Sequence, residues 1–73
     1  MRYTRRVRVL GIDCGSEHTG YGVVEQDHKG TLLYVTAGAI HVSPRQPLAL
    51  RLHRIFSELC RIIGEHRPDT AAI

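Results

Sequence analysis

The first half of the chain alternates extended apolar segments with connections that are too short to hold a helix. The segments 7–13 (VRVLGID), 19–26 (TGYGVVEQ) and 31–42 (TLLYVTAGAIHV) are rich in β-branched and apolar residues, which predicts three strands. Only residues 14–18 and 27–30 separate them. Since a parallel crossover needs roughly a dozen residues or more, we expect the three strands to pair as antiparallel hairpins.

The spacing of apolar residues changes after residue 47. Seven apolar residues then recur at helical intervals and would share one face: Leu48, Leu52, Ile55, Phe56, Leu59, Ile62 and Ile63. Pro47 suits the first helical turn and Pro68 ends the pattern, which predicts a helix over 48–66. We expect this helix to cover the sheet, with Cys60 packed near its apolar side.

Two further features complete the predicted α/β arrangement. Gly38 is expected to mark a bulge in the third strand. Residues 70–73 (TAAI) begin another extended segment, which after a long helix is expected to return to the sheet as a parallel strand. A chain of 73 residues is at most one small domain, and this one stops inside a strand. We therefore expect residues 1–73 to be the N-terminal portion of a larger domain.

Composition restricts the class of protein without identifying it. Ten basic residues, among them Arg2, Arg5, Arg6, Arg8 and Arg45, outnumber seven acidic ones and give a net charge of +3. This balance suits a polyanionic partner, and it equally suits a solubilising surface. Two cysteines are too few for the disulfide framework of a small secreted domain. With no signal peptide and no membrane span visible, the expected location is the cytoplasm and no membrane partner is expected.

Asp13 is the principal candidate for chemistry. It ends an apolar strand, and Gly11 and Gly15 on either side leave room for a phosphate or a metal ion. A rigidly held carboxylate is a ligand that Mg²⁺ prefers, and such an ion can activate water for phosphodiester cleavage. From spacing alone, an Asp that only caps the following turn is the more common case. The other acidic residues are expected to serve in turns or on the solvated helix face.

The loop after Asp13 offers weaker candidates. Cys14 and His18 could begin a zinc site or form a nucleophile with its base, but no further ligand pair or third member follows. Ser16 and Thr19 could bind phosphate, and satisfying the backbone of their own turn is an equal alternative. The remaining histidines are scattered along the sequence and receive no role.

The run GIDCGSEHTGYGVVE resembles the opening strand, loop and strand of the RuvC-type crossover junction endodeoxyribonucleases, the Holliday junction resolvases. Their pattern is roughly GIDPGxxxTGYGV. Arg51-Leu52 near the start of the helix, then His66-Arg67-Pro68-Asp69 and the strand Ala71-Ala72-Ile73, fit the same family in order and spacing. The resemblance covers residues 7 to 73. Cys14 stands where the family commonly has Pro, which loosens the turn and removes no ligand.

The resemblance implies a ribonuclease H-like fold and a homodimer that nicks four-way DNA junctions with Mg²⁺. It also implies roles in DNA recombination and repair and a branch-migration helicase complex as partner. The family's site has four carboxylates, of which only the first maps onto this chain, as catalytic residue and metal ligand Asp13. The second is expected directly after Ile73 and the last two in a distant helix. We therefore expect the 73-residue chain alone to be inactive and poorly folded.

Three alternatives remain open from the sequence. Actin-like sugar kinases and related ATPases open with a similar strand and an Asp-x-Gly-Ser loop, which Asp13-Cys14-Gly15-Ser16 fits. A related RNA-processing nuclease would share the fold but cut structured RNA. A non-catalytic basic module would bind nucleic acid with a steep salt dependence and without needing Asp13.

Overall fold

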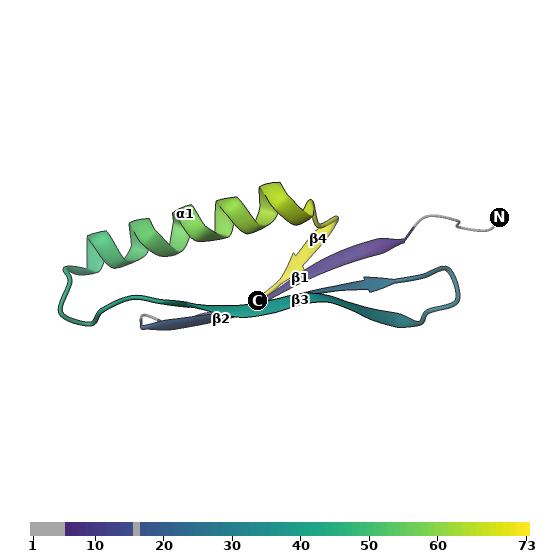
Figure 1. Ribbon diagram of the computed structural model, residues 1–73, viewed down its shortest axis with the longest axis horizontal. Helices are drawn as coiled ribbons and strands as arrows, with labels where there is room; N and C mark the ends of the chain where they lie inside the picture. Colours follow the sequence, from purple (N-terminus) through teal and green to yellow (C-terminus); the bar gives the residue numbers. More distant parts are fainter. Residues whose placement is uncertain (1–5, 16) are drawn as a thin grey trace.

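The computed structural model describes residues 6–15 and 17–73. A four-stranded sheet carries one long helix on one face, as Figure 1 shows. The elements are β1 (Val7–Asp13), β2 (His18–Gln26), β3 (Leu32–His41), α1 (Leu48–His66) and β4 (Thr70–Ala72). The predicted order of three strands, a helix and a fourth strand is therefore confirmed, and the strand bounds differ from the prediction by one residue at most.

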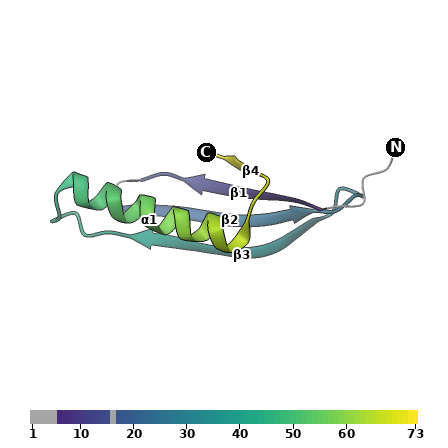
Figure 2. The same ribbon diagram turned by 90° about the horizontal axis from the view of Figure 1, so that it is seen from above.

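The sheet has the order β3-β2-β1-β4. β1 pairs antiparallel with β2, and β2 pairs antiparallel with β3. β4 returns from the helix and pairs parallel with the other edge of β1, with Ala72 beside Gly11. Seen from above, α1 runs along β2 and β3 (Figure 2). This arrangement leaves the opposite face of the sheet uncovered by any described element.

The turns follow from local chemistry. In the β2–β3 turn, Asp27 Oδ1 accepts hydrogen bonds from the amides of Lys29 and Thr31 at 2.9 and 3.0 Å, and Gly30 takes the left-handed backbone that Gly adopts readily (φ 86°). These amide bonds, first that of Thr31, hold the pKa of the Asp27 carboxyl below its ordinary value.

The predicted helix bounds are confirmed at both ends. Pro47 precedes the first turn, and its carbonyl accepts the amides of Leu50 and Arg51. Arg67 adopts a left-handed conformation (φ 48°), and its amide donates to the Ile63 carbonyl at 2.8 Å. Pro68 then prevents the helix from continuing.

The core lies between α1 and the facing side of the sheet. Its buried members are Leu10, Val23, Ile40, Val42 and Ile62. Ile55 and Leu59 of α1 pack against them, so the helix contacts the sheet through positions 55, 59 and 62. The predicted apolar face is wider than the buried stripe, because Leu48, Leu52 and Ile63 are about half exposed and Phe56 is 66% exposed. Cys60 is exposed, so the prediction that it packs near the apolar side of the helix is wrong.

The predicted bulge at Gly38 is also wrong in position. The register shifts between Val23 and Val24, whose partners are Thr36 and Tyr34, so Val35 is the extra residue. Gly38 instead pairs regularly with Tyr21. A Cβ at position 38 would lie 2.6 Å from Tyr21 Oη and 2.9 Å from Cζ, so the glycine makes room for the tyrosine ring.

The helix content gives no sign of a membrane segment. Within residues 6–15 and 17–73, no helix is long and apolar enough to cross a bilayer.

Candidate active site

Asp13 lies at the C-terminal end of β1 and is exposed. Its cross-strand partner is Gly20, and Gly11 pairs with Gly22 two residues earlier. Since Leu10 and Ile12 face the core under α1, alternation directs Gly11 and Asp13 to the opposite, open face of the sheet. Gly11 and Asp13 therefore share a face of the sheet.

A shallow hollow of about 380 Å³ borders the Asp13 carboxylate. It is lined by Gly11, Ile12, Asp13, Gly20, Tyr21, Gly22, Ala72 and Ile73. A Cβ added to Gly11 or Gly22 would meet nothing closer than a backbone oxygen at 3.9 Å. The missing side chains therefore leave open space next to the carboxylate, where a phosphate or an ion can approach.

Asp13 is a single carboxylate at this position. Within the described residues, no group of three or more His, Cys, Asp or Glu side chains is arranged to hold a metal ion. None of the ion pairs found among residues 6–15 and 17–73 involves Asp13, so no described cation occupies its oxygens. The carboxylate is thus available as one oxygen ligand, and the other ligands of a divalent ion would have to come from elsewhere.

The loop after β1 is held by Thr19. Its side chain is 1% exposed, and Oγ1 donates to the Gly15 carbonyl at 2.9 Å. The hydroxyl therefore satisfies the backbone of its own turn, one of the two alternatives that the sequence left open. Ser16, the other hydroxyl of that prediction, lies outside the described residues.

Cys14 and His18 make separate contacts. Cys14 is an exposed free thiol beside an apolar hollow on the helix side of the sheet, with Gly15, Thr19 and Leu52. His18 lies instead against His41 of β3, with their Nδ1 atoms 2.6 Å apart. Sequence reasoning missed this pair because the two histidines are 23 positions apart, and only the β2–β3 register brings them together.

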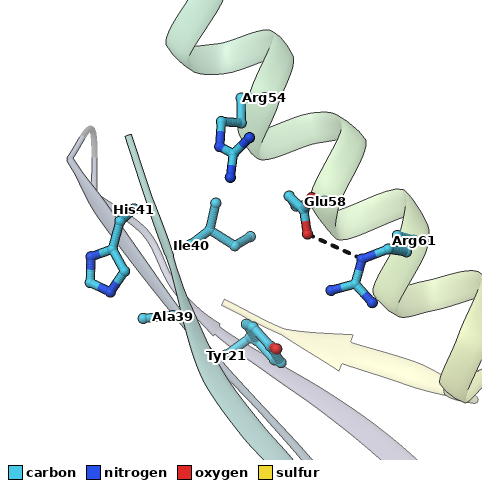
Figure 3. A pocket seen from close by; sticks show the side chains of 7 residues that line it. All are labelled: Tyr21, Ala39, Ile40, His41, Arg54, Glu58 and Arg61. Atoms are coloured by element: carbon cyan, nitrogen blue, oxygen red, sulfur yellow. Dashed lines mark hydrogen bonds and ion pairs between the residues drawn. The ribbon is translucent and has the colours of Figure 1, made fainter. Parts of the chain in front are cut away.

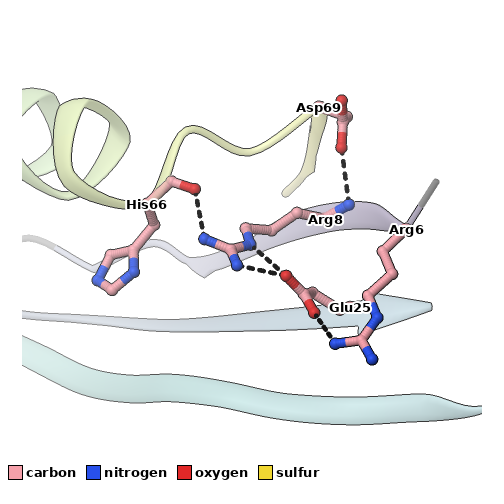
Figure 4. Close-up of polar contacts among 5 residues, drawn as sticks. All are labelled: Arg6, Arg8, Glu25, His66 and Asp69. Atoms are coloured by element: carbon pink, nitrogen blue, oxygen red, sulfur yellow. Dashed lines mark hydrogen bonds and ion pairs between the residues drawn. The ribbon is translucent and has the colours of Figure 1, made fainter. Parts of the chain in front are cut away.

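A polar cluster joins the two inner strands of the sheet, β1 and β2, to the end of the helix (Figure 4). The Arg8 guanidinium donates two hydrogen bonds to Glu25, its cross-strand partner, and a third to the carbonyl of His66 at 2.7 Å. Arg6 donates to the other Glu25 oxygen at 3.2 Å. The bonds from Arg8, followed by Arg6, hold the pKa of Glu25 below its ordinary value against the opposing effect of desolvation.

A further pocket lies between α1 and β3, an edge strand of the sheet (Figure 3). It is lined by Tyr21, Ala39, Ile40, His41, Arg54, Glu58 and Arg61. Arg61 donates to Glu58 at 3.1 Å and to Glu65 at 2.8 Å, and these partners, Glu58 first, raise the pKa of the guanidinium. Glu58 therefore already neutralises the charge of Arg61, so the pocket has less positive charge available to bind an anion than its two arginines would indicate.

Comparison with models of known protein families shows which family has this arrangement of strands and helix. The family model described as crossover junction endodeoxyribonuclease RuvC matches residues 9–73. This chain belongs to the RuvC family. The match runs from β1 through β4 and so includes Asp13 and the strand that flanks it.

Curated relatives carry the same description. Crossover junction endodeoxyribonuclease RuvC of Koribacter versatilis is 54% identical over 67 residues, and that of Geobacter metallireducens is 52% identical over 67 residues. Each match covers 92% of this chain and 40% of the relative. The chain thus spans about two fifths of the length of these RuvC proteins.

Solved structures agree with the fold. RuvC of Thermus thermophilus has a TM-score of 0.80 with 31% identity, and the T. thermophilus RuvC solved in complex with a Holliday junction substrate has a TM-score of 0.79 with 28% identity. Both matches cover 89% of this chain and 40% of the solved chain. The predicted ribonuclease H-like fold is therefore confirmed for the N-terminal part of a RuvC protein. Among the sequence-based alternatives, the comparisons support the resolvase family.

Proposed function

We propose that this chain contributes the first carboxylate of a metal-dependent endonuclease that cuts four-way DNA junctions. The observation that carries the proposal is the position of Asp13. It is an exposed acidic residue at the end of β1, beside a glycine-lined hollow, in a chain of the RuvC family. The T. thermophilus relative solved with a Holliday junction substrate supports junction DNA as the substrate.

The residues around Asp13 fit one ligand position of a divalent cation. Its carboxylate oxygens are the hard donors that Mg²⁺ prefers. When bound, Mg²⁺ would supply activation of water and stabilisation of the leaving oxygen of the phosphodiester. Gly11, Gly20 and Gly22 present no side chain on the open face, so a DNA backbone can reach the Asp13 carboxylate without a clash.

The register of β4 supports a second acidic residue next to Asp13. Ala72 lies beside Gly11, and extending this parallel register by two positions brings residue 74 beside Asp13. Alternation gives that position the same face as Gly11 and Asp13. An acidic residue after Ile73, which the family resemblance implies, would therefore share a cation with Asp13.

Other parts of the proposal depend on the family alone. They are the homodimer, a role in DNA recombination and repair, a branch-migration helicase complex as partner, and location in the cytoplasm. The three carboxylates other than Asp13 lie outside this sequence, so we propose that the 73-residue chain by itself does not cut DNA. Residues 1–73 would form the N-terminal portion of one nuclease domain.

A chimera tests the role of Asp13. This chain would replace the matching 67 residues of the K. versatilis RuvC, to which it is 54% identical. We expect the chimera to cut a synthetic four-way DNA junction in Mg²⁺, and Asp13→Asn to reduce cleavage to background while junction binding persists. Glu65→Gln, which removes an exposed helix carboxylate, is the matched control and should retain cleavage.

The same chimera separates the alternatives. Cleavage that survives Asp13→Asn would contradict the proposed metal ligand. Preference for structured RNA over junction DNA would favour an RNA-processing nuclease. Tight ATP binding without DNA binding would favour the kinase-like function, and salt-sensitive DNA binding without any cleavage would favour a non-catalytic module.

A further inference from the structure

His18 and His41 face each other across the β2–β3 ladder at the end of the sheet where β2 begins. Their Nδ1 atoms are 2.6 Å apart, and the two rings meet edge to face with centroids 4.7 Å apart and an interplanar angle of 80°. Both residues are exposed. The two imidazole nitrogens therefore lie within hydrogen-bonding distance of each other, at a place that solvent ions can reach.

The backbone explains why the rings come so close. His18 and His41 are direct cross-strand partners, and the next pair outward is hydrogen-bonded, with the Val42 amide donating to the Glu17 carbonyl at 3.0 Å. Hydrogen-bonded and non-hydrogen-bonded pairs alternate along an antiparallel ladder, so the histidines occupy a non-hydrogen-bonded pair. Side chains approach each other most closely at such pairs.

We infer that His18 and His41 form a binding site for one late first-row transition-metal ion, with Zn²⁺ as the representative. Neutral imidazole nitrogen is a preferred ligand of these ions, through either Nδ1 or Nε2. With a zinc–nitrogen distance of about 2.0–2.1 Å, two ligand nitrogens of a tetrahedral site lie roughly 3.3–3.4 Å apart. The two nitrogens, now 2.6 Å apart, would have to separate by somewhat less than 1 Å, which the exposed side chains accommodate by rotation.

The site would lie on the open face of the sheet, distinct from the Asp13 carboxylate. His18 precedes Gly20 by two residues on β2, so the two share a face, and Gly20 pairs with Asp13. Figure 3 shows the His41 ring on the side of β3 away from α1. Water would complete the coordination shell, because no third His, Cys, Asp or Glu of the described residues joins the pair. A bound ion would link the start of β2 to the end of β3, just before the connection to α1.

Two variants with complementary sets of histidines test the inference. The first, His28→Gln/His53→Gln/His66→Gln, retains only the proposed pair. The second, His18→Gln/His41→Gln, retains the other three histidines. Zn²⁺ is titrated by calorimetry into the 73-residue chain and into each variant, in a sulfate buffer that strengthens the fold of a small domain. We expect the parent and the first variant to bind one ion per chain with similar affinity, and the second variant to lose this binding.

Single variants, urea and Cu²⁺ test whether both rings of the folded chain hold the ion. Each single change, His18→Gln or His41→Gln, should abolish binding as the double change does, because chelation needs both rings. Urea should abolish binding by the parent, since only the folded β2–β3 register unites the pair. With Cu²⁺ in place of Zn²⁺, electron paramagnetic resonance should show coupling to two nitrogens, and each single variant should lose this two-nitrogen signal. Asp13→Asn should retain Zn²⁺ binding, which separates this site from the proposed nuclease site.

Several results would overturn the inference. They are no Zn²⁺ binding by the parent, equal binding by the second variant, or binding that persists in urea. Circular dichroism without metal should be the same for the parent and the second variant, because both replaced side chains are exposed. If the two spectra differ, the loss of binding in the second variant could come from unfolding, and the test becomes the Cu²⁺ spectrum of the first variant. Coupling of Cu²⁺ to fewer than two nitrogens in that variant would refute the paired site.

Discussion

Arg8 and Asp69 are joined by a reciprocal pair of hydrogen bonds. The Arg8 amide donates to Asp69 Oδ2 at 2.8 Å, and the Asp69 amide donates to the Arg8 carbonyl at 2.7 Å. Thr70 follows directly and pairs with Val9. The two bonds therefore align the returning chain with β1 before the short β4 ladder begins, and so place Ala72 next to Gly11.

Replacing Asp69 tests this alignment. We expect Asp69→Ala to lower the free energy of unfolding by about 1 kcal/mol, because the Arg8 amide loses its acceptor in an exposed site. Asp69→Asn keeps an oxygen acceptor and should lose less. Urea unfolding in a sulfate buffer, which strengthens the fold of a small domain, measures both. Equal midpoints for the parent and Asp69→Ala would show that the bonds add nothing to stability.

The Glu25 carboxylate predicts a stability loss in acid. Hydrogen bonds from Arg8, then Arg6, hold its pKa in the folded chain below the ordinary value of 4.5. A group with a lowered folded pKa contributes stability that is present above its unfolded pKa and disappears as the pH falls through the folded value. We therefore expect the free energy of unfolding to decrease as the pH is lowered from about 4.5. Glu25→Gln should weaken that dependence, and an unchanged pH profile would contradict the assignment.

The contact between Gly38 and Tyr21 predicts that alanine destabilises the chain more at position 38 than at position 22. We expect Gly38→Ala to destabilise the chain by about 1–3 kcal/mol, because the new Cβ would displace the tyrosine ring. Gly22→Ala is the matched control in the neighbouring strand, where a Cβ meets nothing closer than 3.9 Å. Combining Gly38→Ala with Tyr21→Ala should remove the clash, so the two effects should be non-additive in a double-mutant cycle. Additive effects would refute the contact.

The helix offers a test of which apolar residues pack. Ile62 is 1% exposed and Phe56 is 66% exposed. We expect Ile62→Ala to cost about 2–4 kcal/mol through lost burial and the cavity it leaves. Phe56→Ala should change the unfolding free energy by roughly 0.5 kcal/mol or less. A larger loss for Phe56→Ala than for Ile62→Ala would mean that α1 packs on the sheet with a different rotation.

The hydrogen bond of the Thr19 hydroxyl predicts a modest loss of stability when that hydroxyl is removed. Thr19→Val keeps the shape of the buried side chain and removes the donor to the Gly15 carbonyl. We expect a loss of about 1 kcal/mol in unfolding free energy. Thr36→Val, on the neighbouring strand, is the control for the same chemical change. Similar losses in both would indicate that the bond to Gly15 is not the cause.

The sequence alone was sufficient for the features that local physics decides. Strand period, short connections and flanking prolines predicted the order of elements and both ends of α1, because backbone preferences act within a few residues. The motif around Asp13 was equally local, and it led to the family that residues 9–73 match. The role of Asp13 as a metal ligand remains a prediction.

Only the tertiary structure decided what depends on register. A bulge at Val35 or at Gly38 fits the same strand composition. Only the observed register, in which Val23 pairs with Thr36 and Val24 with Tyr34, selects Val35. The same register brings His18 to His41. Which apolar side chains of α1 become buried was likewise undetermined by their spacing, because that depends on how the helix is rotated over the sheet. These contacts join residues far apart in the chain, and no local preference specifies them.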